Sequence, residues 1–272
     1  MVANPVDDEE RHLPASRKAR LAAYVTEAGQ VTVAALATSF GVSADTIRRD
    51  LDQLDNEGVL IRTHGGAIAL QAALRPDTAV DVRSRMQSDA KDRIGAAAAE
   101  LIPDGAVVII NAGSTALALV RHLQRHRDLT IATNNLRAAL EINPDVCRDL
   151  HLFGGRVRIS GETTTGPVSL PSVFGPEHHE IRADFAFISV GGVSADDGFS
   201  TSHIEEAGMM AEMMARSDKV AVLADHSKFG RRLFARVVEL QAADYLVTDA
   251  APPAELAEAL AEAEVEVALP GA

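Results

Sequence analysis

The stretch VSADTIRRDLDQL, residues 42–54, decides how the N-terminal part of the chain folds. Three apolar residues of this stretch lie one helical turn apart along the chain: Ile47, Leu51 and Leu54. That spacing predicts an α-helix with one apolar face. Ser43 stands where a side chain caps the start of a helix. The paired arginines Arg48 and Arg49 fall on the face opposite the apolar one, where they are available to a partner.

Two further helices are predicted before this stretch, over residues 17–28 and 33–40, and a short glycine turn separates the second helix from the third. The segment that follows, 59–70, is predicted to be a small hairpin that carries Arg62 and His64 at its tip. Two helices joined by a short turn, the second with exposed arginines near its start, are typical of a helix-turn-helix that reads the major groove of DNA, and the hairpin would be its wing. An ordinary three-helix bundle with solvated arginines is the alternative, and it does not explain why turn, cap, arginines and wing follow in this order.

The composition is that of a globular protein, with 47% hydrophobic and 24% charged residues among 272. A net charge of −13 by itself argues against binding to nucleic acid. The charge is unevenly distributed, however, because the seven Lys and Arg residues between 11 and 66 roughly balance the acidic residues there. We therefore expect a winged helix-turn-helix domain at 11–70, a linker at 71–88 and an α/β domain at 89–272.

Several classes of protein are excluded by motifs that the chain lacks. Its single cysteine, Cys147, forms no intramolecular disulfide and suits a reducing compartment. No apolar run reaches the roughly 18 residues of a membrane span, and the N-terminus has no export signal, so we expect a cytoplasmic protein that does not enter a membrane. The run His178-His179-Glu180 lacks the spacing of a zinc motif, so neither a metal nor a cofactor is expected.

Short apolar runs alternate with helical stretches in the C-terminal part of the chain. The predicted strands are 106–110, 129–133, 150–153, 184–190, 220–224, 245–248 and 265–269. Such alternation predicts a mostly parallel sheet covered by helices. In that architecture ligands bind at the carboxyl ends of the strands.

Small and polar residues follow several of these predicted strands. The loop NAGST at 111–115 leads from a strand into a helix, so its backbone amides and hydroxyls would meet an anion at the positive end of the helix. Lys228 is the only lysine among these loops, and its ammonium group would suit a phosphate monoester. Glu205, at the start of another helix, would either accept sugar hydroxyls or merely stabilise the helix dipole. The sequence therefore predicts a phosphate site at the strand ends.

These segments together resemble the DeoR family of bacterial transcriptional regulators. The resemblance is carried by residues 42–54 and 62–67, KDRI at 91–94, AGST at 112–115, TNN at 133–135, FGG at 153–155, DFAF at 184–187, Gly198, EE at 205–206 and ADHSKFG at 224–230. Two positions depart from the family pattern: Asn111 stands where Asp is common, and Ser114 where Thr is commoner.

The resemblance implies a repressor of carbohydrate-utilisation genes, whose C-terminal domain is similar to sugar-phosphate isomerases and senses a phosphorylated sugar or a glycolytic intermediate. By position, the residues that would face double-stranded operator DNA are Ser43, Thr46, Arg48, Arg49, Arg62 and His64. The residues that would line the effector site are Gly113, Ser114, Thr115, Thr133, Asn134, Gly154, Gly155, Glu205 and Lys228.

A sugar-phosphate isomerase or deaminase with an accessory DNA-binding domain is the alternative function. Such an enzyme needs a base beside a carbonyl, and Glu205, Glu206 and Asp225 are the candidates. The helix-turn-helix favours the regulator, which would not be an enzyme. Because one small winged helix makes few contacts with DNA, we expect a homo-oligomer that binds paired half-sites.

Overall fold

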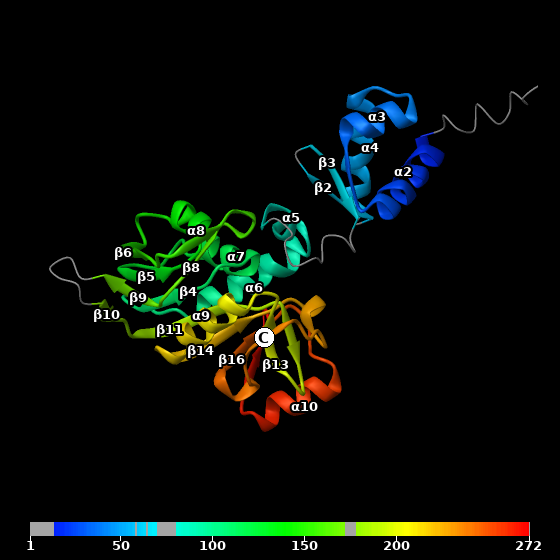
Figure 1. Cartoon of the computed structure of the whole chain (residues 1–272). Coiled ribbons are helices and arrows are strands. Elements are labelled where there is room, and N and C mark those ends of the chain that lie inside the picture. Colours follow the sequence, from blue (N-terminus) through cyan, green and yellow to red (C-terminus); the bar gives the residue numbers. More distant parts are fainter. Residues whose placement is uncertain (1–13, 58, 64, 70–79, 172–177, 272) are drawn as a thin grey trace, which may run out of the picture. The chain divides into compact units, whose positions relative to one another are not determined.

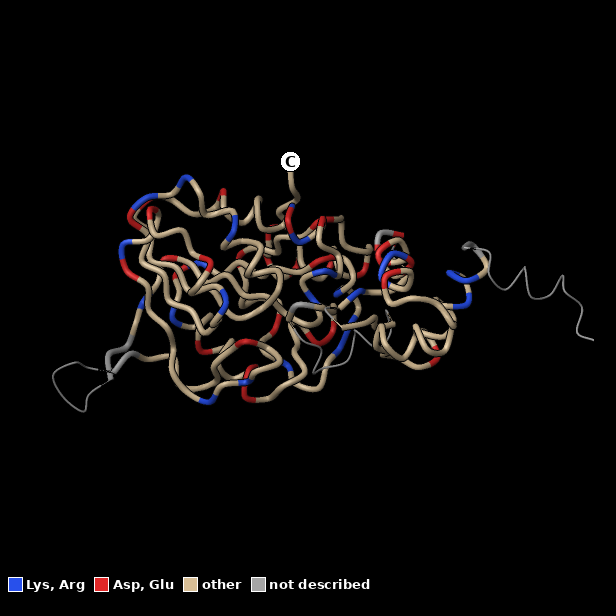
Figure 2. Tube along the Cα trace, turned by 90° about the horizontal axis from the view of Figure 1, so that it is seen from above, with Lys and Arg blue, Asp and Glu red and all other residues tan. Residues whose placement is uncertain are grey.

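The computed structural model describes residues 14–57, 59–63, 65–69, 80–171 and 178–271. The chain divides into two compact units, of which the first ends at Met86 and the second begins at Gln87. Among the described residues, none of the helices combines the length and the apolar character that a membrane span requires. Figure 2 shows that basic and acidic residues are interspersed along both units. The first unit carries six basic and six acidic residues between positions 14 and 69, so it is close to neutral while the chain as a whole has a net charge of −13.

The N-terminal unit contains the predicted helices and the predicted hairpin. Its elements are α2 (Pro14–Ala28), β1 (Gln30–Thr32), α3 (Val33–Phe40), α4 (Ala44–Asn56), β2 (Leu60–Thr63), β3 (Gly66–Ala69) and α5 (Val80–Arg85). The three strands form an antiparallel sheet in the order β1-β3-β2, so the wing predicted at 59–70 is the hairpin of β2 and β3. Strand β1 was not expected, because its three residues have no pattern of their own and it exists only by pairing with β3.

The core of this unit is built from the apolar faces of its helices. The residues buried there include Leu21, Val25, Leu36, Ile47, Leu51 and Leu54. Gly41 ends α3 with a left-handed φ of 65°, a conformation that favours glycine. Ser43 then caps α4, because its side chain accepts a hydrogen bond from the Thr46 amide at 3.2 Å. The turn between α3 and α4 therefore has the chemistry that the sequence predicted.

Helix α5 lies within the stretch predicted as a linker, 71–88. It packs on the wing, since Val82 shares a small buried cluster with Ile61 of β2. The side chain of Arg85 also donates to the Arg62 carbonyl oxygen at 3.1 Å. The C-terminal part of the expected linker is therefore an element of the first unit, while residues 71–79 lie outside the described part of the chain.

The second unit is a parallel sheet between layers of helices (Figure 1). Its main strands are β4 (Val107–Ile110), β5 (Leu129–Thr133), β6 (Cys147–Leu152), β11 (Ala183–Ser189), β14 (Ser217–Leu223), β16 (Tyr245–Val247) and β17 (Glu266–Ala268). They are all parallel, in the order β17-β16-β14-β11-β4-β5-β6. Each corresponds to one of the predicted strands, and the expectation of a mostly parallel α/β domain is confirmed.

Helices cover both faces of this sheet. One face packs against α6 (Ser88–Glu100), α7 (Ser114–His122) and α8 (Leu136–Glu141). The other face packs against α9 (Ile204–Ala215) and α10 (Ala254–Glu262), with Met209, Met210, Met213 and Met214 buried in that layer. The methionines of α9 are therefore packing residues.

Short elements at the rim of the sheet were not expected from the sequence. They are the hairpin of β7 (Arg156–Arg158) and β8 (Thr163–Thr165), the pair β9 (Ser169–Pro171) and β10 (His178–Glu180), a sheet of β12 (Gly192–Ser194), β13 (Gly198–Thr201) and β15 (Ala235–Val238), and the 3-10 turns η2 (Ile159–Gly161), η3 (His226–Lys228) and η4 (Leu240–Ala242).

Along the chain, β4 is followed by β5 and β6 on one side, and β11 then returns to the other side of β4. The strand order therefore reverses between β4 and β11, which is where ligands bind in open α/β sheets.

Candidate functional site

Four of the residues predicted to face DNA lie at the exposed start of α4. The hydroxyl groups of Ser43 and Thr46 are 2.9 Å apart within the helix cap. Arg48 is half exposed and pairs with Asp45 one turn earlier, at 2.5 Å between Nη1 and Oδ1. Arg49 is also exposed. Because Asp45 is itself exposed, its pair with Arg48 contributes little to stability, and that guanidinium is easily transferred to a phosphate or a base.

The two predicted DNA contacts on the wing have different outcomes. The guanidinium of Arg62 forms an ion pair with Asp52 of α4, and its backbone amide donates to Asp55 at 3.0 Å. Only 19% of the Arg62 side chain is exposed, so in this structure the residue fastens the wing to α4. His64 lies outside the described residues.

One buried ion pair orients α4 and was not found from the sequence. Asp50 of α4 is 7% exposed and accepts from Arg17 of α2 through both oxygens, from Nε at 2.6 Å and from Nη2 at 3.2 Å. A bidentate pair of this kind fixes direction as well as distance. The two residues are 33 positions apart, so no local pattern marks them.

The side chain of Asn111 links the carboxyl ends of β4 and β11, the place in the sheet that is called the strand crevice below. Its side chain donates to the Ser189 carbonyl oxygen at 2.9 Å and accepts from the Ser189 amide at 2.7 Å. The Ser189 hydroxyl in turn accepts from the Ala116 amide of α7 at 2.8 Å. Gly113 lies against this contact, since a Cβ there would be 2.6 Å from the Ser189 Cβ. The loop at 111–115 is thus held rigidly at the point where the strand order reverses.

Three backbone amides at the start of α7 remain available to a ligand. The Ala112 amide donates to Asn134 at 2.7 Å, and the Ala116 amide to Ser189. Between them, the amides of Gly113, Ser114 and Thr115 donate to no other group within the described residues. Amides at the positive end of a helix are able to bind an anion, and the anion site that the sequence predicts at this loop stays a prediction.

Thr133 and Asn134 lie beside this loop but are occupied within the protein. Thr133 is fully buried, and its hydroxyl donates to the Ile110 carbonyl oxygen at 2.6 Å. The Asn134 side-chain nitrogen donates to the Thr163 hydroxyl and to the Thr164 carbonyl oxygen, both at 2.9 Å. These two residues were predicted to line the effector site, and in the structure their side chains hydrogen-bond to the protein backbone and to Thr163.

Gly154 and Gly155 are exposed and enter the β7–β8 hairpin. Gly155 has a φ of 125°, and a Cβ there would be 2.2 Å from the Thr165 carbonyl oxygen. Only glycine fits such a position. Its function in the structure is to let the two chain segments approach closely.

Lys228 follows β14, two strands away from β4. Its Nζ lies 3.8 Å from Oδ2 of Asp225, a fully buried carboxylate, and 18% of the lysine side chain is exposed. The other oxygen of Asp225 accepts from the Ser227 amide at 3.0 Å. The lysine is therefore held near the strand ends by a buried negative charge.

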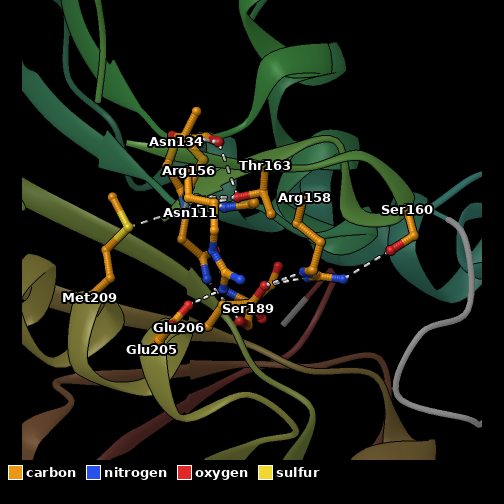
Figure 3. A network of polar contacts seen from close by, with 12 residues as sticks. Asn111, Asn134, Arg156, Arg158, Ser160, Thr163, Ser189, Glu205, Glu206 and Met209 are labelled. Atoms are coloured by element: carbon orange, nitrogen blue, oxygen red, sulfur yellow. Dashed lines mark hydrogen bonds and ion pairs between the residues drawn. The ribbon is translucent and has the colours of Figure 1, made fainter. Parts of the chain in front are cut away.

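A second charged cluster lies between the β7–β8 hairpin and the start of α9 (Figure 3). Glu205 pairs with Arg156, and Glu206 pairs with Arg158, whose Nε donates to Oε1 at 2.9 Å. These residues line a cavity of about 230 Å³. Of the predicted effector residues, Glu205 belongs to this cavity, while the two arginines and Phe234, which also line it, were not predicted. The one sequence signal was the alternation of Arg156 and Arg158, which places both side chains on one face of a strand.

Next to Lys228, His226 contacts Asp249 twice. The carboxylate accepts from the His226 amide at 2.8 Å and lies 2.7 Å from its ring Nδ1. Burial by itself raises the pKa of Asp249, but the hydrogen bonds from the His226 side chain and backbone outweigh it, and the pKa lies below its ordinary value.

No group of three or more His, Cys, Asp or Glu side chains that could hold a metal ion occurs in the described ranges.

Comparison with known proteins places this geometry in a family context. The profile of the DeoR C terminal sensor domain matches residues 86–250, and that of the DeoR-like helix-turn-helix domain matches residues 17–73. The HTH-type transcriptional repressor CsqR of Escherichia coli is 30% identical, over 93% of this chain and 95% of that protein.

Two further relatives have similar coverage. The glycerol-3-phosphate regulon repressor of Escherichia coli is 29% identical, over 90% of this chain and 94% of that protein. The HTH-type transcriptional repressor GlcR of Bacillus subtilis is 31% identical, over 84% and 86%. Among solved structures, ribose 5-phosphate isomerase A of Methanocaldococcus jannaschii matches at a TM-score of 0.35 and 18% identity, over 53% of this chain and 55% of that chain.

Proposed function

The chain belongs to the DeoR family of transcriptional regulators, and from that premise we propose that it represses carbohydrate-utilisation genes by binding operator DNA through α4, under the control of a phosphorylated sugar. The observation that carries the proposal is that one chain has both features. Exposed arginines lie at the start of α4, and available backbone amides lie at the start of α7 in the strand crevice. The name of one relative, a glycerol-3-phosphate regulon repressor, agrees with a small phosphorylated effector. Binding to chromosomal DNA would place the protein in the cytoplasm.

DNA contact is assigned to Arg48 and Arg49, supported by Ser43 and Thr46 at the helix start. A bidentate contact of arginine with guanine contributes roughly 1 to 3 kcal/mol of discrimination, and a phosphate contact strengthens binding to all sequences alike. Arg62 would reach DNA only after leaving Asp52, so its first function is to set the angle of the wing.

The test replaces both arginines of α4. An operator selected from random duplexes should bind the Arg48→Ala, Arg49→Ala variant far more weakly than the parent, with a flatter dependence on salt. The matched control removes two exposed arginines of the second unit, Arg125→Ala and Arg127→Ala, and should bind like the parent. Equal binding by a folded Arg48→Ala, Arg49→Ala variant would contradict the assignment of α4.

The phosphate of the effector is assigned to the start of α7. The amides of Gly113, Ser114 and Thr115 supply donors, and the side chain of Lys228 extends from a position two strands away, roughly 10 Å at ordinary strand spacing. A phosphate between them would accept from both sides. To control DNA binding, the ligand must bind two arrangements of the protein with different affinity, and a coupling of about 1 to 3 kcal/mol would change DNA affinity several-fold to a hundredfold.

The test of this site measures operator affinity with and without a panel of sugar phosphates. Lys228→Ala should bind the operator without ligand like the parent and should no longer respond to the sugar phosphate that acts on the parent. The control is Lys219→Ala, which removes another lysine paired with an aspartate, Asp244 at 2.6 Å, away from the crevice. A normal response of Lys228→Ala, or an equal response to the unphosphorylated sugar, would overturn the phosphate site.

A homo-oligomer is part of the proposal. Two winged helices on one duplex raise affinity through effective concentration, with half-sites about one helical turn apart or multiples of it. Sedimentation at micromolar concentration should therefore give at least a dimer. A monomer with and without operator DNA would contradict this.

Isomerase or deaminase turnover is not part of the proposal. Of the carboxylates considered as bases, Glu205 and Glu206 are each paired with an arginine, and Asp225 is fully buried beside Lys228. A base must reach the proton that it abstracts from substrate. Incubation with the same panel of sugar phosphates should give no conversion, and catalytic conversion of any one would revive the enzyme alternative.

A further inference from the structure

The cavity of about 230 Å³ beside α9 has a lining of unusual composition. Two arginines and two glutamates line it and form the pairs Arg156–Glu205 and Arg158–Glu206 (Figure 3). Phe234 is the aromatic member of the lining. The cavity is smaller than the roughly 300 to 1,000 Å³ of drug-sized sites, so its occupant is a small molecule or one part of a molecule.

The paired charges leave hydrogen-bonding capacity unused. A guanidinium has more N–H groups, and a carboxylate more lone pairs, than a single pair consumes. Arg158 and Glu206 are only 21% and 13% exposed, so the inner pair is largely shielded from solvent. A hydroxyl group both donates and accepts, and it can therefore bridge the two members of a pair without separating them.

The cavity is also lined by two apolar side chains that are exposed to solvent. Phe234 and Ile204 line it and are 84% and 68% exposed, values that are high for large apolar residues. An exposed ring next to hydrogen-bonding groups offers a surface for the C–H groups of a polyol or sugar ring. The lining thus combines hydroxyl-binding groups with an apolar face.

The cavity lies close to the proposed phosphate site. The Asn134 side chain accepts from Ala112 of the α7 loop and donates to Thr163 of β8. Two hydrogen bonds and the carboxamide between them place the Ala112 amide and the Thr163 hydroxyl no more than about 8 Å apart. Thr165, two residues further along β8, lines the cavity.

We propose that this cavity binds the uncharged, hydroxyl-bearing end of the phosphorylated effector and that its balanced Arg–Glu pairs exclude a second phosphate. The proposal rests on the proposed function and adds to it the part of the protein that selects among sugar phosphates. A second phosphate would meet the negative charges of Glu205 and Glu206, and to bind Arg158 it would have to displace Glu206 from the largely shielded inner pair. A hydroxyl group binds without breaking that pair.

The experiment measures binding of four probes by calorimetry: inorganic phosphate, glycerol 3-phosphate, an aldohexose 6-phosphate and a ketohexose 1,6-bisphosphate. The parent should bind one of the two monophosphates at least about tenfold more tightly than inorganic phosphate or the bisphosphate. Phe234→Ala and Glu205→Gln should each weaken binding of that monophosphate about tenfold and leave binding of inorganic phosphate unchanged.

Matched controls lie outside the cavity. Leu140→Ala removes another large exposed apolar side chain, 87% exposed, and Arg232→Ala breaks another exposed ion pair, with Asp196. Both should bind all four probes like the parent.

Two outcomes would overturn the inference while leaving the proposed function in place. One is a monophosphate affinity of Phe234→Ala and Glu205→Gln equal to that of the parent, and the other is a bisphosphate that binds the parent as tightly as the best monophosphate. If the parent binds none of the four probes, the proposed function fails and this inference fails with it.

Discussion

Asn111 and Asn134 show how single carboxamides organise the crevice. A carboxamide donates and accepts at the same time, so it can satisfy an N–H and a C=O group where neighbouring strands diverge and no ladder remains. Asn111 does this for the backbone of Ser189, and Asn134 for Ala112 and Thr164. A carboxylate at position 111 would accept from the Ser189 amide but could not donate to its carbonyl oxygen.

The single cysteine gives a first prediction at this scale. Burial, with a smaller contribution from the charge of Asp149, raises the pKa of Cys147, so less thiolate is present at neutral pH than in an ordinary thiol. We expect the folded protein at pH 7.5 to react more slowly with a thiol reagent than N-acetylcysteine amide does, and the rate to rise with pH. The urea-unfolded chain is the control and should react like the free thiol. A folded rate equal to that of the unfolded chain would contradict the prediction.

Asp249 gives a prediction for acid. Its folded pKa is depressed, so the stability it contributes is present above the unfolded pKa of about 3.9 and is lost as the pH falls through the lower folded pKa. Between pH 4 and pH 2, the free energy of unfolding should therefore fall more steeply for the parent than for Asp249→Asn. Urea unfolding at several pH values measures this. Identical pH profiles would show that the contact with His226 does not stabilise the fold.

Helices α6 and α7 pack closely enough that one position has no room for a side chain. A Cβ on Gly95 would be 2.6 Å from the Ala118 carbonyl carbon of α7. Backbone atoms cannot move aside as a flexible side chain does, so the glycine determines how near the two helices come. Because α7 carries the proposed phosphate amides, this contact also positions the site.

Glycine substitutions in two helices test this packing. Gly95→Ala should lower the free energy of unfolding by roughly 1 to 3 kcal/mol, because the added methyl group forces the helices apart. Gly208 lies in α9, and a Cβ added there would have no atom within 4 Å apart from its chain neighbours and the backbone of its own helix, so Gly208→Ala should raise stability by up to about 1 kcal/mol through helix propensity. Chemical denaturation of both variants gives the comparison. Stabilisation by Gly95→Ala would show that the helices have room to spare.

The whole molecule consists of two units, and the boundary between them lies further along the chain than the wing. Helix α5 belongs to the DNA-binding unit, since Val82 is 5% exposed and packs with Ile61. One more buried residue adds a large share of the stability of a small unit, because the core of such a unit contains few buried residues.

Fragments of different length test the boundary. A fragment of residues 1–86 should be more stable than one of residues 1–70 by about 1.5 to 3 kcal/mol, the contribution of burying one aliphatic side chain. Thermal and urea unfolding of the two fragments measure the difference. A longer fragment carrying Val82→Ala is the control and should lose most of the gain. Equal stability of the 1–70 and 1–86 fragments would place α5 outside the DNA-binding unit.

The sequence by itself determined the elements whose signals are local. Helix α4 has its apolar period, its cap and its glycine turn within about a dozen residues. The central strands β4, β5, β11 and β14 each contain an apolar run that is followed by small or polar residues. The available amides of residues 113–115 were predicted for the same reason, since a strand, a small loop and a helix follow one another directly. Periodicity and capping act within one segment, so one segment is enough to read them.

Only the tertiary structure decided what distant segments do to one another. Strand β1 exists because it pairs with β3. Helix α5 belongs to the first unit because Val82 packs against Ile61. Glu205 forms an ion pair with Arg156, which is 49 positions away in the sequence. The Asn134 side chain hydrogen-bonds to Ala112 and Thr163 and is not available to a ligand. Such contacts depend on which side chains the folded chain brings within a few ångströms, and a pattern along the sequence contains no such distance.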